Sequence, residues 1–346
     1  MWFSFSSVFP QSNSLSALKP SSQSTTAQVI LPSHVKSITS TTNPFVKHCV
    51  KLRNSSSYRH SHGSVLLVGT TPLREIYNFQ ELLQDKPTTI DCLLLLEKAA
   101  VPEEFVESGI HIVRVNSVVM KKLSGLQSPE SIDTISLVRI PSTFHSLCGV
   151  HHQDFSKWFP SAFRILVLDA IQDPGNLGTL LRSSVAFGWD GVFLLPGCCD
   201  PFNEKALRAS RGASFQLPMV SGTWSDLQSL VDEFQMKILA GDPGNKDELK
   251  KVSYLSYELA HSLKCTKVCL VLGSEGIGLS EDARDCSELV SIATLLKSSY
   301  NTKQTLYNLF AEVNRSTKEE QGWLQSPLEG LRLLIKEHES EIILLF

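Results

Sequence analysis

Short apolar runs separated by mixed segments recur along most of this chain, and they predict alternating strands and helices. In the first half, strands are expected over short segments that are mostly apolar and lie between turn-forming residues. The expected strands there are Ser64–Val68, Ile90–Leu96, Ile110–Val115 and Ile135–Ile140, with helical segments over Pro72–Leu83 and Val118–Leu123. This part of the pattern predicts a small α/β/α domain.

A second series of apolar strands begins near residue 163 and predicts a parallel sheet. Its strands are almost continuously apolar and helices separate them, which is typical of a sheet covered on both faces. Residues 141–160, between the two series, are expected to be an irregular linker, and Gly241–Lys246 a turn-rich surface loop. The expected elements are Ile165–Asp169, Gly178–Phe187, Gly191–Leu195, Asn203–Ala209, Trp224–Phe234, Lys237–Ala240, Lys267–Leu272 and Leu289–Ile292.

The segment Asp173–Arg182 is the first candidate for chemistry. It follows an apolar strand and leads into a helix, so free backbone N–H groups and the positive end of a helix dipole are expected there. Polar ligands of α/β proteins bind at the carboxyl ends of the strands. Asn176 supplies an amide, and Arg182 supplies a planar donor fork suited to phosphate or to a ribose hydroxyl. Taken alone, the segment fits an ordinary loop with a surface arginine equally well.

A second glycine-rich loop, Ser274–Ser280, follows another apolar strand. From Gly273 onward the order is Gly-x-Glu-x-x-Gly, which differs from the Gly-x-Gly-x-x-Gly of dinucleotide-binding proteins, and the sequence contains no Walker loop. The glycines permit positive φ angles and close approach of a ligand, and Glu275 places a carboxylate inside the loop. By itself the loop would more often be a tight turn with a solvated glutamate.

Together the segments are more specific, because they occur in order and at a spacing that resembles the SpoU (TrmH) family of RNA ribose 2′-O-methyltransferases, within the SPOUT superfamily. The resemblance covers residues 163–292, and a weaker one relates residues 43–138 to the substrate-binding domain of that family. The matching segments are Asp173-Pro-Gly-Asn-x-Gly-x-x-x-Arg182, Lys205-Ala-Leu-Arg-Ala-Ser-Arg-Gly-Ala213 and Leu272-Gly-Ser-Glu-Gly-x-Gly-Leu-Ser280.

The resemblance implies an α/β fold with a parallel-sheet catalytic domain, in which the methyl-donor pocket lies in a deep trefoil knot. It also implies a homodimer, S-adenosylmethionine as the methyl donor, and transfer of the methyl group to a ribose 2′-OH of tRNA or rRNA. A small-molecule Rossmann enzyme is disfavoured, because its glycine fingerprint and its acidic ribose-binding residue are missing.

Roles for individual residues follow from the same resemblance. Arg182 would bind the target phosphate and orient the hydroxyl, Asn176 would hold Arg182 or the ribose, and Glu275 would fix its loop or a neighbouring base. Because a guanidinium is a poor base, we expect Arg182 to position the hydroxyl rather than to take its proton. The expected donor-binding residues are Leu272, Gly273, Ser274, Gly278, Ile292 and Leu306, and the expected RNA-binding residues are Lys51, Arg53, Arg59, Arg208 and Arg211.

The carboxyl-terminal part departs from the family pattern. Beyond Ile292 the family's Pro-Met and Ser-Leu-Asn-Val-Ser are missing, and Thr305–Asn308 matches the third motif only loosely. The helix that threads the knot and lines the dimer face has no counterpart, so we expect an alternative carboxyl end. The alternative function is therefore a non-catalytic RNA-binding form, or a truncated isoform, of such an enzyme.

Composition limits the remaining choices. The chain has 346 residues, 42% of them apolar, and a net charge of −3, which is typical of a soluble protein with two domains. No apolar run is long enough to span a bilayer, so no membrane partner is expected. Because the chain has no overall positive charge, RNA contacts must depend on local basic patches. The eight cysteines contain no Cys-x-x-Cys pair, so we expect no metal.

The amino-terminal stretch is rich in Ser and Thr, lacks acidic residues up to residue 74, and shows no helix or strand period. This composition predicts an organelle transit peptide, for the chloroplast rather than the mitochondrion. The expected organisation is a transit peptide over residues 1–42, an RNA substrate-binding domain over 43–140, a linker over 141–160, a SpoU-type methyltransferase domain over 161–315 and a divergent tail over 316–346.

Overall fold

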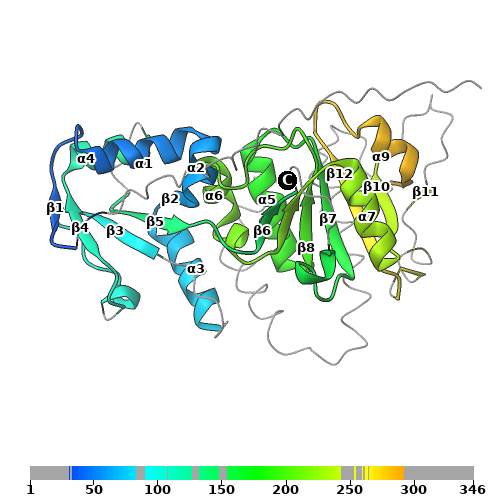
Figure 1. The fold of residues 1–346 in the computed structure, drawn as a ribbon, viewed down its shortest axis with the longest axis horizontal. Coiled ribbons are helices and arrows are strands. Elements are labelled where there is room, and N and C mark those ends of the chain that lie inside the picture. Colours follow the sequence, from blue (N-terminus) through cyan, green and yellow to red (C-terminus); the bar gives the residue numbers. More distant parts are fainter. Residues whose placement is uncertain are drawn as a thin grey trace, which may run out of the picture.

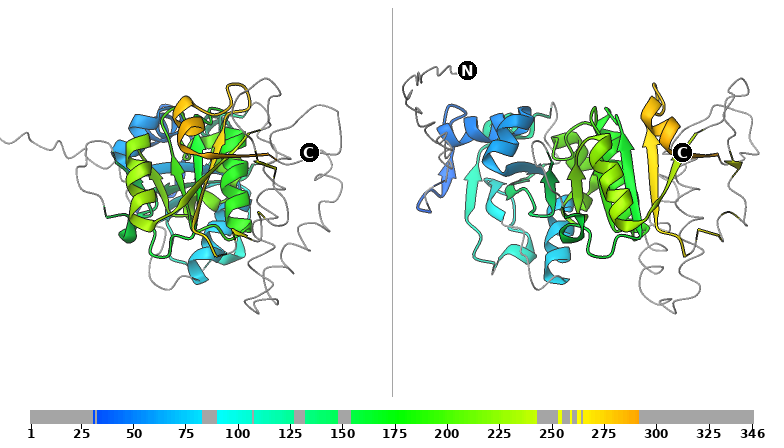
Figure 2. Two further views of the ribbon diagram at one scale, coloured as in Figure 1. Left: turned by 90° about the vertical axis from the view of Figure 1, so that its right-hand side faces the viewer. Right: turned by 45° about the vertical axis from the view of Figure 1, so that its right-hand side comes forward.

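The computed structural model describes residues 31–291 except 32, 83–89, 107, 127–131, 148–153, 243–252, 255–258, 260–261 and 264. The described elements form two α/β units side by side, each built on its own sheet (Figures 1 and 2). The predicted tail over residues 316–346 and most of the predicted transit peptide lie outside the described residues. The trefoil knot also stays a prediction, because the segment that would thread it follows residue 291.

The amino-terminal unit contains a five-stranded mixed sheet. β5 runs antiparallel to both of its neighbours, and the other pairs are parallel. Buried residues on both faces of Ser64–Val68 and Ile90–Leu96 explain the continuous apolar runs of these two strands. The order across the sheet is β1 (Ser37–Ile38), β4 (Ile112–Val115), β3 (Ile90–Leu96), β5 (Thr134–Arg139) and β2 (Ser64–Val68).

β1 corrects the predicted amino-terminal boundary. Ser37 and Ile38 pair in parallel with Arg114 and Val115 of β4, and the Ile38 side chain is buried. Ser37 and Ile38 therefore form an edge strand of the first sheet, inside the range predicted to be a transit peptide without strand structure. A strand of two residues is too short to show a period, so the sequence pattern could not reveal it.

Four helices complete this unit, together with the short 3-10 turn η1 (Glu103–Phe105). The first begins after Asn43, whose side chain accepts the N–H of Phe45, with a proline at its first position. Its buried residues Cys49 and Leu52 recur at helical spacing, yet this helix was not predicted. The helices are α1 (Pro44–Asn54), α2 (Ser56–His62), α3 (Thr70–Leu82) and α4 (Ser117–Ser124).

The second sheet has eight strands, and every pair of neighbours is parallel, as predicted. The order across the sheet is β11 (Ser253–Tyr254), β13 (Glu288–Ser291), β10 (Lys237–Gly241), β12 (Val268–Gly273), β7 (Arg164–Asp169), β8 (Gly191–Leu194), β9 (Met219–Ser221) and β6 (Phe144–Ser146).

Helices cover both faces of this sheet. Along β7 the side chains alternate, so Leu166 and Leu168 join one apolar cluster while Ile165 and Val167 join the other. α5 (Pro174–Ala186) and α6 (Glu204–Ser210) pack on the first of these faces, with the 3-10 turn η3 (Ala213–Phe215). α7 (Trp224–Phe234), α9 (Glu281–Cys286) and the 3-10 turn η2 (Phe155–Lys157) pack on the second. In the part of the chain that is described, no helix is long and apolar enough to cross a membrane.

β6 corrects the predicted linker. Phe144–Ser146 pairs in parallel with β9 at the edge of the second sheet, and Phe155 of η2 is buried. Residues 141–160 are therefore not wholly irregular. A strand of three residues with a polar majority carries no apolar signal, and only its pairing in the folded protein defines it.

The strand order reverses between β7 and β12. From β7 the chain continues to β8 and β9 on one side, then crosses to β10 on the other, and β12 later enters between β10 and β7. The parallel register pairs Gly273 with Asp169, so β12 and β7 end at the same level. A reversal of this kind opens a crevice at the carboxyl ends of the strands, where ligands of parallel sheets bind.

The helices α5 and α6 meet backbone to backbone at Gly178. A Cβ atom at this position would lie 2.5 Å from the carbonyl oxygen of Ala206 and 2.8 Å from the amide nitrogen of Ser210. Because the obstacles are backbone atoms, they move only if the helices separate. The glycine therefore fixes the distance between the two helices.

Gly178→Ala is expected to destabilise the protein by about 1–3 kcal/mol through this overlap. Alanine is otherwise the better helix former by about 1 kcal/mol, so a loss of stability would isolate the packing effect. Urea unfolding followed by circular dichroism measures the change, with Ser183→Ala in the same helix as the control. Unchanged or increased stability of Gly178→Ala would contradict the close packing of α5 on α6.

Candidate functional site

The two predicted loops lie next to each other at the ends of β7 and β12 (Figure 1). Asp169, the last residue of β7, is buried, and one of its carboxylate oxygens accepts the backbone N–H of Ser280 at 2.7 Å. This bond ties the end of the second loop to the first strand. The structure thus brings together the two loops that were predicted to form one site, and Asp169, which was not predicted, joins them.

The helix α5 begins at Pro174, four residues before its predicted start. The side chain of Asp173 accepts the N–H of Asn176 at 2.7 Å, and Pro174 occupies the first helical position. Asn176 therefore lies in the first turn of the helix, where its side-chain amide bonds to no described residue. The capping carboxylate takes one of the N–H groups that were expected to be free for a ligand, which corrects that expectation.

Arg182 lies two turns into α5 and is half-buried. Among the described residues, none forms a hydrogen bond or an ion pair with its guanidinium. Burial, and secondly the charge of the nearby Arg211, lower the pKa of Arg182 below its ordinary value. Two neighbouring cations without a carboxylate partner repel each other, and a bound anion would relieve that repulsion. The pair is therefore suited to phosphate.

The two other predicted RNA-binding residues of this region, Arg208 and Arg211, come from α6 and its carboxyl-terminal cap. Arg211 ends the helix in a left-handed conformation, with a φ of 49°, and its side chain is exposed. Arg208 forms an ion pair with Glu204, one turn earlier, at 3.0 Å. Arg211 is thus open to a ligand, whereas Arg208 already has a partner. Because α6 packs tightly on α5 at Gly178, the position of Arg211 relative to Arg182 is fixed.

The second loop is a closed hairpin. Ser274 and Gly278 exchange two backbone hydrogen bonds of 3.1 and 2.9 Å, and Gly278 has a φ of 80°. A Cβ atom at Gly273 would overlap the carbonyl oxygen of Gly278 and would lie 2.6 Å from the amide nitrogen of Leu279. Only glycine fits this position, because the chain folds back against its own backbone there. The tip of the hairpin, which includes Glu275, is exposed.

Four of the predicted donor-binding residues, Leu272, Gly273, Ser274 and Gly278, lie together at this turn. The Leu272 side chain is buried, so a ligand can reach only its backbone. A turn with three glycines (Gly273, Gly276 and Gly278), next to the end of β7, fits one wall of a pocket in which a polar ligand contacts the backbone. Ile292 and Leu306, the other two predicted donor-binding residues, lie outside the described residues. No three His, Cys, Asp or Glu side chains in the described ranges are grouped to hold a metal.

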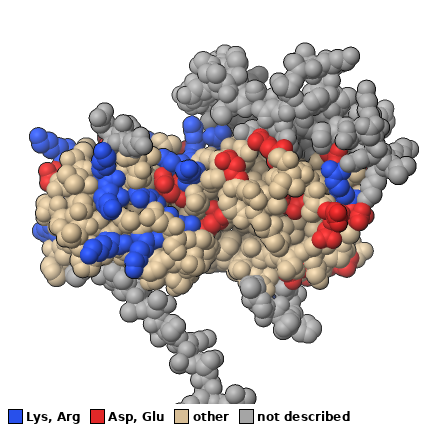
Figure 3. Space-filling model, turned by 90° about the horizontal axis from the view of Figure 1, so that it is seen from above, with Lys and Arg blue, Asp and Glu red and all other residues tan. Residues whose placement is uncertain are grey.

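Positive side chains gather on the amino-terminal unit, on the face that also contains the carboxyl edge of the second sheet (Figure 3). Along this face run α1 and α4 (Figure 1). Acidic side chains gather toward the opposite end, where α9 lies. The uneven charge gives the face a basic half despite the negative net charge of the chain. Exposed lysines of α1 and α4 are Lys47, Lys51, Lys121 and Lys122.

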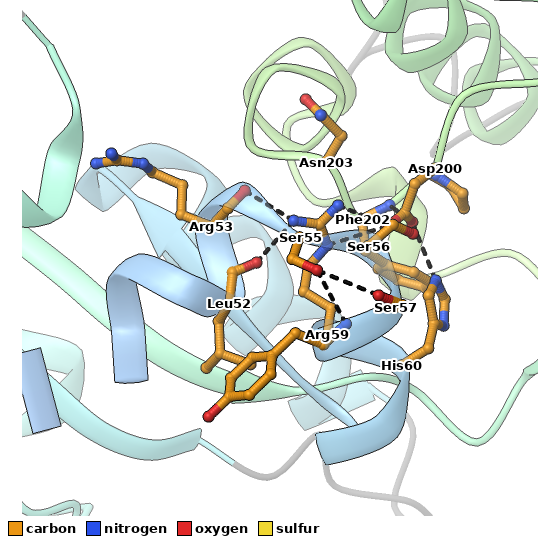
Figure 4. Close-up of polar contacts among 12 residues, drawn as sticks. Leu52, Arg53, Ser55, Ser56, Ser57, Arg59, His60, Asp200, Phe202 and Asn203 are labelled. Carbon is orange, nitrogen blue, oxygen red and sulfur yellow. Dashed lines mark hydrogen bonds and ion pairs between the residues drawn. The ribbon is translucent and has the colours of Figure 1, made fainter. Parts of the chain in front are cut away.

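Arg59 was predicted to bind RNA, and the structure shows that this was wrong. Its side chain is only 3% exposed, and it pairs with Asp200 of the second unit at 2.7 Å (Figure 4). The guanidinium also donates to the carbonyl oxygens of Leu52 and Arg53. The sequence could not reveal this, because the partner lies 141 residues away along the chain.

The other predicted RNA-binding residues of the first unit, Arg53 and Lys51, differ in how exposed they are to RNA. Arg53 is half-buried and donates to the carbonyl oxygens of Lys122 and Leu123 at 2.9 and 2.6 Å, so it closes the end of α4. Lys51 is exposed, with its ammonium 5.6 Å from the centre of the Tyr58 ring. Lys51 is therefore the predicted residue of this unit that RNA can reach most readily.

Asp242 corrects a further prediction. It follows β10 in the stretch predicted to be a surface loop, but its side chain is buried and pairs with Arg284 at 3.2 Å. Asp242 and Asp169 both follow the last apolar residues of parallel strands at the same edge of the sheet. A carboxylate directly after an apolar strand was the signal that could have identified both residues.

Residues 164–306 match the model of the SpoU rRNA Methylase family. An uncharacterised tRNA/rRNA methyltransferase of Synechocystis is 28% identical over 257 residues, which are 72% of this chain and 82% of that protein. The 23S rRNA (guanosine(2553)-2′-O)-methyltransferase RlmP of Bacillus subtilis is 40% identical over 105 residues, or 30% of this chain and 41% of that protein. The mitochondrial rRNA methyltransferase 3 of Xenopus laevis is 26% identical over 259 residues, 72% of this chain and 58% of that protein. The chain thus spans less than two thirds of the last two relatives.

Solved structures share the fold. A crystal structure of an RNA 2′-O ribose methyltransferase matches with a TM-score of 0.61 and 23% identity, over 81% of this chain and 98% of that one. The SpoU methyltransferase AviRb of Streptomyces viridochromogenes, in complex with AdoMet, matches with a TM-score of 0.60 and 18% identity, over 79% of this chain and 97% of that one. These matches confirm the predicted α/β class with a parallel sheet. The chain therefore contains a SpoU rRNA Methylase domain, which the family model matches over residues 164–306.

Proposed function

We propose that this protein transfers a methyl group from S-adenosylmethionine to a ribose 2′-OH of rRNA or tRNA. The observation that carries the proposal is the half-buried Arg182, unpaired among the described residues and beside Arg211, at the sheet that also presents the closed turn at Gly273. The SpoU rRNA Methylase domain supports the methyl-transfer reaction. The activity in the name of RlmP supports the ribose 2′-oxygen as the acceptor.

In this proposal one loop binds the methyl donor, and the helix that follows the other loop binds the RNA. The backbone of residues 272–274 and of Gly278 would hold the donor, which supplies an electrophilic methyl group on its sulfonium when bound. Arg182 would bind the phosphate next to the target ribose and hold the 2′-hydroxyl in line with that methyl group. Alignment of two reactants can supply about 7–11 kcal/mol of the barrier. The 2′-oxygen would take the methyl group as the sulfur–carbon bond of the donor breaks, S-adenosylhomocysteine would leave, and the hydroxyl proton would pass to water. Because a guanidinium stays protonated in proteins, positioning is the role we assign to Arg182.

Transfer to purified RNA tests the proposed function. The full chain is incubated with tritium-labelled S-adenosylmethionine and with rRNA or tRNA that lacks the modification, and the labelled RNA is then hydrolysed in alkali. A 2′-O-methyl group blocks cleavage at its own nucleotide, so label in alkali-resistant dinucleotides is the expected result. Label on mononucleotides would place the methyl group on a base and reject the ribose as the acceptor.

The lysines of α4 are expected to strengthen RNA binding. Replacement of Lys121 and Lys122 by glutamate should lower RNA affinity and reduce the slope of log affinity against log salt by about 1 for each phosphate that is no longer neutralised. Fluorescence anisotropy with labelled tRNA at several salt concentrations measures both quantities. Lys157→Glu, an exposed lysine of η2 before the amino end of β7, serves as the control. An unchanged salt slope in the α4 variant would remove this helix from the RNA surface.

A second candidate function is an RNA-binding form without catalysis. The observation that favours it is the departure from the family pattern after Ile292, where the third motif is matched only loosely. Isothermal titration calorimetry separates the two functions. Binding of S-adenosylmethionine supports the enzyme, whereas RNA binding without donor binding supports the alternative.

We further propose that the protein acts in an organelle, as a homodimer. The mitochondrial location in the name of the Xenopus relative supports an organelle, and the Ser/Thr-rich, acid-free amino-terminal stretch supports the chloroplast. A fluorescent fusion of the full chain would distinguish chloroplast from mitochondrion. Sedimentation equilibrium of the purified chain would give the number of subunits.

A further inference from the structure

We propose that Asp200 is a positioning residue for RNA methylation, because it fastens the amino-terminal unit to the helix that ends beside Arg182. The inference rests on the proposed function. It concerns the loop over residues 198–203, which connects β8 to α6 and faces α2 of the first unit (Figure 4).

Groups from both units surround the carboxylate of Asp200. Its Oδ2 atom accepts hydrogen bonds from Nε and Nη2 of Arg59, at 3.0 and 2.7 Å, and from the hydroxyl of Ser56 at 2.6 Å. Its Oδ1 atom lies 3.3 Å from Nε2 of His60 and accepts the backbone N–H of Phe202 at 2.9 Å. Three of these partners come from α2, and one comes from the same loop.

The pair is enclosed and charged. The side chain of Asp200 is 9% exposed and that of Arg59 is 3% exposed. Burial alone would raise the pKa of Asp200, but the bonds from His60, Ser56 and Arg59 outweigh it and hold the pKa below its ordinary value. Charge-assisted hydrogen bonds of this kind fix direction as well as distance.

Arg59 carries the connection further into the first unit. Its Nη1 atom donates to the carbonyl oxygens of Leu52 and Arg53 at 2.7 and 2.8 Å, in the last turn of α1. α1 is one of the two helices with exposed lysines on the basic half of the face. One guanidinium therefore joins the surface suited to RNA to the loop of the second unit.

From Asp200 the connection continues to the cation pair. The carbonyl oxygen of Asp200 accepts the N–H of Asn203, the residue that caps α6. α6 packs without spare room on α5 at Gly178, and it ends at Arg211, whose charge acts on Arg182. A shift of the Asp200 loop would therefore move the helix that sets the distance between these two arginines.

Apolar contacts also join the two units. These contacts oppose separation of the units, but they do not fix the angle between them. Buried residues of both sheets belong to one apolar cluster, and the ring centres of His60 in the first unit and Phe144 in the second lie 5.4 Å apart. Such contacts are non-directional. We therefore assign the angle between the units to the bonds of Asp200, and their cohesion to the apolar core.

The test compares two variants that differ in stability but both lack the ion pair. Asp200→Asn leaves the buried Arg59 without its counter-charge, which destabilises a protein strongly, whereas removing both members of a buried ion pair is often neutral. In Arg59→Met with Asp200→Asn, stability should therefore recover. Asp91→Asn, which breaks an exposed ion pair to Arg139 within the first unit, is the control.

For the single and the double variant, kcat for transfer to an RNA that the wild type methylates should fall about tenfold, because the bound RNA is misaligned. The KM for that RNA and the Kd for S-adenosylmethionine should stay within about twofold, because no residue assigned to contact the RNA or the donor is replaced. A purely structural role predicts that kcat returns with stability in the double variant. Wild-type kcat in the double variant would therefore overturn the inference.

A second measurement does not depend on activity. Spin labels at Lys121 of α4 and Ser225 of α7, introduced as unnatural amino acids, report the distance between the units. One narrow distribution is expected for the wild type and a broader one for the double variant, and equal distributions would overturn the inference. If the wild type methylates no RNA, the proposed function fails, while the distance measurement still decides whether Asp200 fixes the angle between the units.

Discussion

Arg182→Ala is expected to lower the rate of methyl transfer by about a hundredfold or more, because the reacting hydroxyl loses the group that holds it in line. The affinity for S-adenosylmethionine should stay within about twofold, because the donor contacts in our proposal come from the backbone of the other loop. Single-turnover transfer to RNA measures the rate, and calorimetry measures donor binding.

The reason lies in the surroundings of this guanidinium. It is half-buried beside a second cation, and in the described part of the chain it has no carboxylate partner, so a bound phosphate would be its counter-charge. Arg182→Lys keeps the charge but loses the planar fork, so its rate should lie between those of alanine and the wild type. Arg74→Ala, an exposed arginine paired with Glu104 in the first unit, is the matched control. Wild-type rates for Arg182→Ala would remove this residue from the mechanism.

The fold was predictable wherever a strand is buried on both faces. β2, β3 and the helix α7 have the predicted bounds, because a long apolar run or a clear helical period is visible without knowledge of the neighbours. The short strands β1, β6, β9 and β11 were missed. Each has three residues or fewer, and pairing with a strand far along the chain defines it.

The site was predictable to the extent that local sequence determines it. Both loops follow apolar strands, and a parallel sheet brings the carboxyl ends of neighbouring strands to one edge. The predictions failed where a distant partner decides the role of a charge. The sequence indicated that Arg59 is an exposed cation, but its side chain is buried in an ion pair with Asp200. Asp169 was predicted only as the last residue of a strand, but its carboxylate binds the backbone of the second loop at Ser280. Sequence spacing contains no information about such pairs.

Gly273→Ala is expected to weaken S-adenosylmethionine binding while leaving the fold intact. The added Cβ would overlap the carbonyl oxygen of Gly278, and the overlap can be relieved only if the hairpin over residues 274–278 opens. Overpacking against backbone costs about 1–3 kcal/mol. If the donor must close the hairpin again, its affinity falls by about 5- to 150-fold. Because Gly273 is the last residue of β12, the strand pairing before it should remain.

Gly276→Ala is the matched control for this prediction, because it lies in the same hairpin and a Cβ there would meet no atom within 4 Å. Calorimetry should show near-wild-type donor affinity for Gly276→Ala and a clear loss for Gly273→Ala, with similar circular dichroism spectra for both. Full donor affinity in Gly273→Ala would show that the closed turn is not part of the donor pocket. Loss in both variants would instead place the donor against the tip of the hairpin, because the only feature they share is an added methyl group in that loop.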